Sequence, residues 1–340
     1  MFCKTAVLVL AISSGFAQEA GSGNAAPMPP IPSVPVPTQP FQPPVNEWAA
    51  KMKVCGTLPI LSFQDNSSQA VFLSCGPREG QPVAVYKLAT APAQFIASTW
   101  VGSEFAGLAF PGRLWRLADG VWRESASSYG SSLFWDSRVG LLVSGAGASG
   151  SHELFSNTLV QGPACNKIAR VGEYIYCLDG GGIFRKVGSQ WRYEATIQNA
   201  NGMAGDNAYL YITTSAQYGM GGAVKPVSGI NTEPVLPSFG AQMPQEWGSI
   251  VRLSQAPDGS LYGPKVIADG LESGWNSVVA GGGKVYVTNF ARRGGEAKWE
   301  ILYTDSFGAT GVFLSNQELV KFGGGEYAYP QALALVPSTP

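Results

Sequence analysis

Short apolar and aromatic runs, separated by Gly, Asp, Asn and Pro, fill the chain from residue 48 onward. Examples lie at 70–73 (AVFL), 83–86 (VAVY), 174–176 (YIY), 209–212 (YLYI) and 284–287 (KVYV). Their β-branched and aromatic residues, bounded by turn residues, are typical of strands. Helical periodicity is nearly absent, and only the stretch near 47–52 predicts a short helix. The sequence therefore predicts an all-β fold.

A hairpin whose second strand carries a tryptophan recurs along the chain. Two copies lie at 112–124 and 183–194, and a looser copy lies at 283–300. We expect the tryptophans of these copies to pack between sheets: Trp122, Trp191 and Trp299. A repeat of this kind cannot bury its apolar faces alone, so neighbouring copies must stack around an axis.

Hairpins that recur about every 35 to 50 residues are typical of the blades of a β-propeller. The candidate blades lie near 58–98, 104–127, 130–162, 168–198, 204–268 and 276–315. This division predicts a β-propeller of six or seven blades over residues 48–340. We expect the apolar segment 332–336 to pair with 58–61, because joining the N- and C-terminal strands removes open sheet edges. A tandem pair of β-sandwiches is the alternative, since it also uses short strands and turns.

The segment 172–176 (GEYIY), followed by glycines at 180–182 and by Trp191, resembles a kelch-type propeller blade. The segment 258–262 (DGSLY) is similar to the loop-to-strand junction of other propeller families. The resemblance covers the general blade pattern over most of 58–336, and no copy is complete. It implies the propeller fold and carries over no catalytic residue.

Two segments precede this domain. Residues 1–17 have a basic start, an apolar stretch and small residues before Ala17, which predicts a signal peptide. The alternative is a membrane anchor, although the apolar stretch is shorter than the ~20 residues that span a bilayer. Residues 18–47 are rich in proline, which predicts an extended tether. A ligand for a proline-binding partner is the alternative role of this tether.

The cysteine pattern fits an exported protein. Of the five cysteines, Cys3 lies in the predicted leader, which leaves four. An even number in an exported chain predicts two disulfides. Of the three pairings, the local one joins Cys55 to Cys75 and Cys165 to Cys177, and each closed loop stabilises the fold by about 3 kcal/mol. Four free thiols are the alternative, whereas zinc is disfavoured because the chain has no CxxC spacing.

Charge and motifs exclude several functions. Charged residues are 13% of the chain, with 22 basic and 23 acidic, so no basic surface for nucleic acid is expected. The glycines at 145–150 fit GxGxxG, but no helical pattern or suitably spaced acid follows, so we interpret them as a turn and expect no cofactor. His152, the only histidine, is expected in a loop. Carboxylate-only chemistry stays open, because the acids could converge in three dimensions.

The stretch 215–248 interrupts the rhythm of strands, and long loops of this kind are often functional. The candidate binding residues lie on this loop or are tryptophans elsewhere: Tyr218, Met220, Met243, Trp247, Trp275, Trp100 and Trp135. The leading hypothesis is a non-enzymatic binding or scaffold module, exported to the periplasm, cell surface or medium, with a protein partner in an envelope or extracellular assembly. A carbohydrate-binding adhesin and a secreted polysaccharide-active enzyme that uses carboxylates are the alternatives.

Overall fold

Antiparallel strands dominate the computed structural model of the protein. The structure describes residues 47–76, 83–110, 112–127, 131–144, 150–153, 158–161, 163, 165–215, 248–271, 277–293, 296–325 and 327–337. These residues belong to one unit of the chain, Pro43–Pro340. Their strands form six four-stranded sheets, and every pairing is antiparallel. The all-β prediction is confirmed.

Each sheet follows the chain from its innermost strand outward, apart from the C-terminal strand that begins the first sheet. The first three sheets are β24 (Pro330–Leu335), β1 (Leu61–Asp65), β2 (Ala70–Cys75), β3 (Ala84–Thr90); β4 (Phe95–Val101), β5 (Glu104–Ala109), β6 (Arg113–Ala118), β7 (Val121–Ser127); and β8 (Ser132–Asp136), β9 (Gly140–Ser144), β10 (Gly150–Glu153), β11 (Thr158–Gln161).

The remaining three sheets have the same plan. They are β12 (Lys167–Val171), β13 (Tyr174–Asp179), β14 (Gly182–Val187), β15 (Gln190–Thr196); β16 (Ala200–Gly205), β17 (Tyr209–Thr214), β18 (Gly248–Gln255), β19 (Leu261–Leu271); and β20 (Val278–Gly281), β21 (Lys284–Arg293), β22 (Glu296–Asp305), β23 (Thr310–Leu314).

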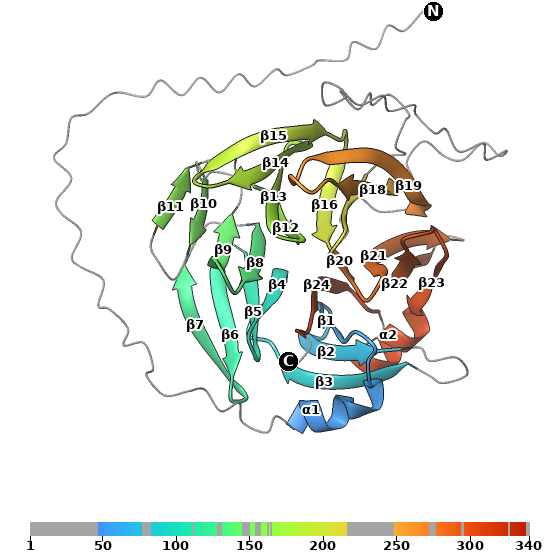
Figure 1. Cartoon of the computed structure of the whole chain (residues 1–340). Coiled ribbons are helices and arrows are strands. Elements are labelled where there is room, and N and C mark those ends of the chain that lie inside the picture. Colours follow the sequence, from blue (N-terminus) through green and yellow to red (C-terminus); the bar gives the residue numbers. More distant parts are fainter. Residues whose placement is uncertain are drawn as a thin grey trace, which may run out of the picture. The chain divides into compact units, whose positions relative to one another are not determined.

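The six innermost strands form a closed ring. Strands β24, β4, β8, β12, β16 and β20 contact one another in this order, and β20 contacts β24 again (Figure 1). Sheets that radiate from such a ring form a β-propeller. The alternative of tandem β-sandwiches is therefore wrong, since each sheet contacts two neighbours around the ring.

The C-terminal segment pairs with the N-terminal strand as predicted, but mainly with residues 61–65 instead of 58–61. In the β1–β24 ladder, Leu61 lies opposite Leu335. Three side chains bind the backbone of β24. The Ser62 hydroxyl donates to the Ala334 carbonyl at 3.0 Å, and Ser98 on β4 donates to the Ala332 carbonyl at 2.5 Å. The Ser277 hydroxyl accepts from the backbone amide of Leu333 at 2.9 Å. The C-terminal strand is thus bound by the sheets on both of its sides.

This closure explains where the predicted blade boundaries differ from the sheets. The first candidate blade ran to residue 98 and so included part of β4. In the structure β24 takes the innermost place beside β1, so β4 begins the next sheet. The tryptophan of the looser repeat also lies on a different strand of its sheet. Trp122 and Trp191 lie on the fourth strands β7 and β15, whereas Trp299 lies on the third strand β22.

Two helices complete the described elements. The predicted N-terminal helix is α1 (Glu47–Lys51), which continues as the 3-10 helix η1 (Met52–Cys55) and contacts β3. Helix α2 (Asn316–Gly323) contacts β22 and has a Ser315–Glu318 capping box. Among the described segments, no helix has the length and apolarity needed to cross a bilayer.

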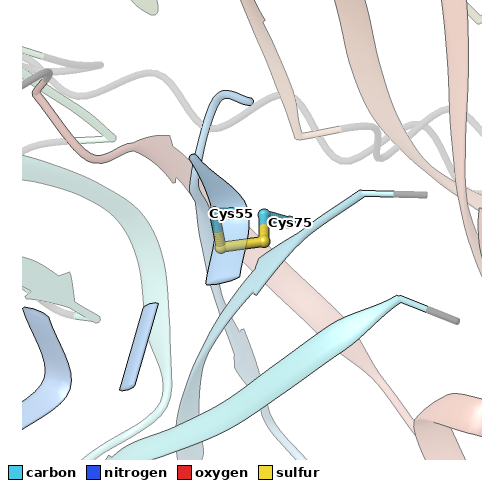
Figure 2. Close-up of a disulfide and its surroundings, with 2 residues drawn as sticks. All are labelled: Cys55 and Cys75. Carbon is cyan, nitrogen blue, oxygen red and sulfur yellow. A yellow bond between two sulfur atoms is a disulfide. The ribbon is translucent and has the colours of Figure 1, made fainter. Parts of the chain in front are cut away.

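Both predicted disulfides are present. Cys55 at the end of η1 is joined to Cys75 at the end of β2, with a Cα–Cα distance of 5.7 Å (Figure 2). Cys165, just before β12, is joined to Cys177 on β13, with a Cα–Cα distance of 5.1 Å. The first disulfide attaches the N-terminal helical segment to the first sheet, and the second fixes the chain at the beginning of an inner strand.

Apolar clusters fill the spaces between neighbouring sheets. One cluster joins Leu73 of the first sheet to Phe95 and Phe105 of the next. Polar contacts reinforce the later interfaces. The Arg252 guanidinium on β18 lies 4.4 Å from the centre of the Tyr209 ring and donates to the Ser306 carbonyl of the next sheet at 2.5 Å. The interfaces between sheets therefore combine apolar burial with bonds from side chains to turns.

Candidate functional site

The inner strands surround a cavity of about 750 Å³, which we call the central channel. Residues from the innermost strand of every sheet line it. Each of these strands contributes a small residue to the lining: Ala97, Ser132, Ala169, Ala204, Ala280 and Ala334. Small side chains keep the space near the axis open, so the channel can admit a ligand.

Close contact between inner strands also requires a glycine. A Cβ on Gly205, at the end of β16, would overlap the backbone carbonyl oxygen of Arg170 on β12. The ends of β12 and β16 therefore lie side by side. Asp136 at the end of β8 binds the same arginine, so these three inner strands end at one rim of the channel.

Four charged side chains form a network at this rim. The Asp136 carboxylate accepts hydrogen bonds from Arg138 Nε at 3.2 Å, from the Arg138 backbone amide at 2.8 Å and from Arg170 Nη1 at 3.1 Å. Glu173 pairs with both arginines. The Asp136 side chain is fully buried, whereas 75% of the Glu173 side chain is exposed. The network joins the third and fourth sheets at the channel mouth.

The surroundings of Asp136 keep it ionised. Burial alone raises the pKa of this carboxyl group, but the hydrogen bonds from Arg138 and the positive charges of Arg170 and Arg138 outweigh that effect. The pKa therefore lies below its usual value. A carboxyl group with a lowered pKa is a poor proton donor near neutral pH, because a general acid needs a raised pKa.

A second acid at the rim, Asp206, stabilises a turn. Its carboxylate accepts from the backbone amides of Ala208 and Tyr209, both at 2.8 Å, and from the Tyr211 hydroxyl at 2.9 Å. Burial of Tyr211, together with the neighbouring carboxylate, raises the pKa of its phenol. Among the described lining residues, Asp136 and Asp206 are the carboxylates, and both are bound by their own surroundings.

Lys167 lines the channel at the beginning of β12, away from this rim. Burial lowers the pKa of its ammonium group. The other lining residues at the beginnings of inner strands include Ser132 on β8 and Ser277 before β20, which are uncharged. The channel therefore has a network of charges at its rim and a separate cation at the other end of β12.

The structure corrects the prediction for Trp100. Only 3% of this residue is exposed, and its ring packs 5.5 Å from that of Trp48 and 5.7 Å from that of Phe105, measured between centroids. Its indole nitrogen donates to the Ser62 hydroxyl at 2.9 Å. Trp100 lies on an inner strand and faces the adjacent sheet, so it belongs to the core and offers no surface for a ligand.

Trp135 is different, because it lies on β8 and lines the channel. The other candidate binding residues lie outside the described residues: Tyr218, Met220, Met243, Trp247 and Trp275. The described strands therefore bring one of the predicted binding residues to the cavity.

His152 was expected in a loop, and this was wrong. It lies in β10, opposite Val143 of β9 and Leu159 of β11. Most of the GxGxxG segment, at 145–149, lies outside the described residues. No group of three or more His, Cys, Asp and Glu side chains that could hold a metal occurs among the residues that the structure describes.

Sequence reasoning missed the charged lining residues, which are Asp136, Lys167, Arg170 and Asp206. One signal was available for part of the site. Asp136 and Asp206 each directly follow a short apolar run and begin a turn, as residues at the end of an inner strand do. Nothing in the local pattern distinguishes Lys167, because the sequence does not reveal which strand of a sheet lies nearest the axis.

Comparisons with known proteins find similarity only among solved structures. No protein-family model and no curated protein matches the sequence. TolB from Acinetobacter baumannii has a TM-score of 0.46 at 11% identity, covering 83% of this chain and 67% of its own. A proposed 6-phosphogluconolactonase from Bacteroides uniformis has a TM-score of 0.42 at 11% identity, covering 82% and 99%. The computationally designed protein Ika8 has a TM-score of 0.40 at 10% identity, covering 83% and 91%. The fold assignment therefore rests on the sheets of this chain.

Proposed function

We propose that the protein is an exported, non-enzymatic binding module of an envelope or extracellular assembly, and that its ligand or partner enters the central channel. We take each of the six sheets as one propeller blade. The channel carries this proposal. Its volume of about 750 Å³ is within the range of ligand sites, and residues from all six inner strands line it.

The state of the acids supports binding over hydrolysis. A carboxylate-dependent glycosidase needs one carboxyl group that stays protonated and a second that faces the substrate. In the described lining, Asp136 is bound by two arginines, and Asp206 is bound by backbone amides and a phenol. The lowered pKa of Asp136 does not suit a protonated acid, and the oxygens of Asp206 are occupied by hydrogen bonds, so the enzyme hypothesis is the weaker one.

Two observations support export. The disulfides Cys55–Cys75 and Cys165–Cys177 are stable in oxidising compartments and rare in the cytosol of mesophiles. The pattern of residues 1–17 predicts a signal peptide. The periplasm, the cell surface and the medium all fit these features.

Carbohydrate is the second candidate ligand, and Trp135 favours it. This partly buried tryptophan lines the same channel as residues that carry hydroxyl groups, such as Ser132 and Thr99. A ring with polar neighbours suits a sugar, because it offers an apolar face for stacking while the neighbouring hydroxyls form hydrogen bonds.

The test is to fill the channel. Thr99 lines it from β4, and Thr99→Trp places an indole there. Thr310→Trp is the matched control, because Thr310 is exposed on the outermost strand β23. Both variants and the wild type would be used as bait in native envelope and culture fractions, and the recovered proteins and glycans identified by mass spectrometry.

We expect the wild type and Thr310→Trp to recover the same ligand and Thr99→Trp to lose it by at least tenfold. Thermal unfolding of each variant verifies that it is folded. Equal recovery by all three proteins would place the binding site outside the channel and would refute this proposal. Turnover of a polysaccharide by the wild type would instead support the enzyme hypothesis.

A further inference from the structure

The inner strand β12 carries two cations in different situations. Arg170 lies at the rim and is paired with Asp136 and Glu173. Lys167 is the first residue of this strand and Val171 is the last. At a rise of about 3.3 Å per residue, the two lie about 13 Å apart along the strand. The acids of the rim are therefore too far along the axis to neutralise Lys167.

The charges near Lys167 can be followed strand by strand. Strands β8, β12 and β16 end together at the rim, so their beginnings also lie at similar levels. The lining residues nearest this level on the neighbouring strands are Ser132 on β8 and Met203 on β16, which are uncharged. The ammonium group of Lys167 has no hydrogen bond or ion pair with the residues that the structure describes.

A partly buried ammonium group without an anion is unfavourable. Removing a charge from water disfavours the charged form, and in this channel burial lowers the pKa of the lysine. A methionine or leucine would fill the same place without that penalty. Charged groups kept in such surroundings are frequently functional, because a bound ligand can supply the missing opposite charge.

We propose that Lys167 is the counter-ion for a single carboxylate on the ligand of the central channel. This inference rests on the proposed function, because it names the chemistry of a ligand for the same cavity. One ammonium group neutralises one negative charge, and Arg170 is already paired, so a monoanionic carboxylate fits better than a phosphate dianion. Trp135 lines the same channel near the rim, whereas Lys167 lies at the other end of β12, so an acidic sugar chain that extends between them is the favoured source of the carboxylate.

Chemical modification of the wild-type protein tests the site directly. Formaldehyde condenses with a free amine to give an imine and water, and cyanoborohydride reduces the imine to a methylamine. Peptide mass spectrometry would follow the methylation rate of each lysine with glucuronate, glucose, N-acetylglutamate or inorganic phosphate present. Lys87 and Lys265 are exposed and serve as internal references.

We expect glucuronate to slow methylation of Lys167 at least threefold and glucose to leave it unchanged, with the reference lysines unaffected by either. If N-acetylglutamate alone slows methylation of Lys167, the site still binds a carboxylate, but the ligand is an acidic peptide instead of a sugar. Equal protection by phosphate would overturn the preference for a monoanion. Equal protection by glucose, protection by none of the compounds, or no methylation of Lys167 would overturn the site.

A stability measurement separates this role from a structural one. Lys167→Met removes the uncompensated charge, so we expect its Tm to rise by a few degrees, whereas the exposed control Lys87→Met stays unchanged. A lower Tm for Lys167→Met would reveal a structural partner and overturn the inference. If Thr99→Trp abolishes ligand recovery but Lys167→Met does not, the proposed function stands and this inference fails. If neither variant affects recovery, both fail.

Discussion

The buried ion pair between Arg185 and Glu194 allows a quantitative test of how the sheets are held together. Arg185 Nε lies 2.8 Å from Glu194 Oε1, and the two side chains are only 4% and 3% exposed. Arg185 also donates to the Asp258 carbonyl of the next sheet, and its guanidinium lies 5.3 Å from the centre of the Tyr174 ring. The pair therefore links the fourth sheet to a turn of the fifth.

Glu194→Gln removes the negative charge and leaves a buried guanidinium without its counter-ion. Breaking a buried pair in this way costs about 3–5 kcal/mol. For a domain of this size, roughly 2–4 °C of Tm is lost per kcal/mol, so the expected decrease in Tm is roughly 6–20 °C. Urea denaturation would measure the change in the free energy of unfolding, and calorimetry would measure the change in Tm.

Arg113 and Glu124 provide a matched control on the equivalent hairpin of the second sheet. Their side chains are 61% and 42% exposed, and Arg113 Nε lies 3.9 Å from Glu124 Oε1. Glu124→Gln should change the free energy of unfolding by less than about 1 kcal/mol, because water screens an exposed pair. Equal losses in Glu194→Gln and Glu124→Gln would refute the reasoning from burial.

The double variant Arg185→Met with Glu194→Leu separates the effect of an unpaired buried charge from the effect of losing the contact with the next sheet. It removes both charges and fills their space with apolar atoms, which is often neutral for stability. Loss of the bond to the Asp258 carbonyl costs about 1 kcal/mol. We therefore expect the double variant to be more stable than Glu194→Gln. A double variant less stable than the single one would show that contact with the next sheet outweighs the charge.

Two further changes test the rim of the channel. Gly205→Ala should lower the free energy of unfolding by about 1–3 kcal/mol, since the new Cβ overlaps the Arg170 carbonyl; unchanged stability in urea would mean that β12 and β16 do not approach closely. The lowered pKa of Asp136 means that its contribution to stability is complete above the unfolded-state pKa of about 3.9 and is lost as the pH falls through the lower folded-state pKa. The difference in stability between wild type and Asp136→Asn should thus be constant from about pH 7 to 5 and shrink below about pH 4; a difference that grows toward acid pH would contradict the network.

The general architecture could be predicted because local patterns carry it. Strands and turns follow from runs such as 174–176 and 209–212, and the local disulfides follow from cysteine spacing. Pairing of the segment 332–336 with the N-terminal strand could be predicted from its apolar pattern alone. These features depend on short segments, whose composition reflects the burial of each strand.

The place of a strand within its sheet could not be predicted in the same way. Trp299 resembles Trp122 in its local sequence, but it lies on a third strand instead of a fourth. Trp100 resembles a surface aromatic, but it lies on an inner strand between two sheets. Which strand lies innermost depends on how the ring closes, and closure is set by contacts between residues far apart in sequence.

The same limit applies to the channel. Its charged residues come from strands of the third to fifth sheets, and they meet only because the ring is complete. In the sequence, the visible interruption of the strand pattern lies instead at 215–248, which contains several of the predicted binding residues. Lys167 and Arg170 lie in an ordinary strand pattern, so their different environments become apparent only from the order of the sheets.

The position of β24 has a consequence for how the protein forms in the cell. Strands β1 to β3 are made early, but the sheet they belong to lacks its innermost strand until residue 335 has been synthesised and delivered. If the chain crosses a membrane as an extended polypeptide, the ring cannot close until nearly all of it has arrived. The edge of β1 that pairs with β24 would then stay open until the end, and chaperones that bind unpaired strand edges would have the most time to bind it.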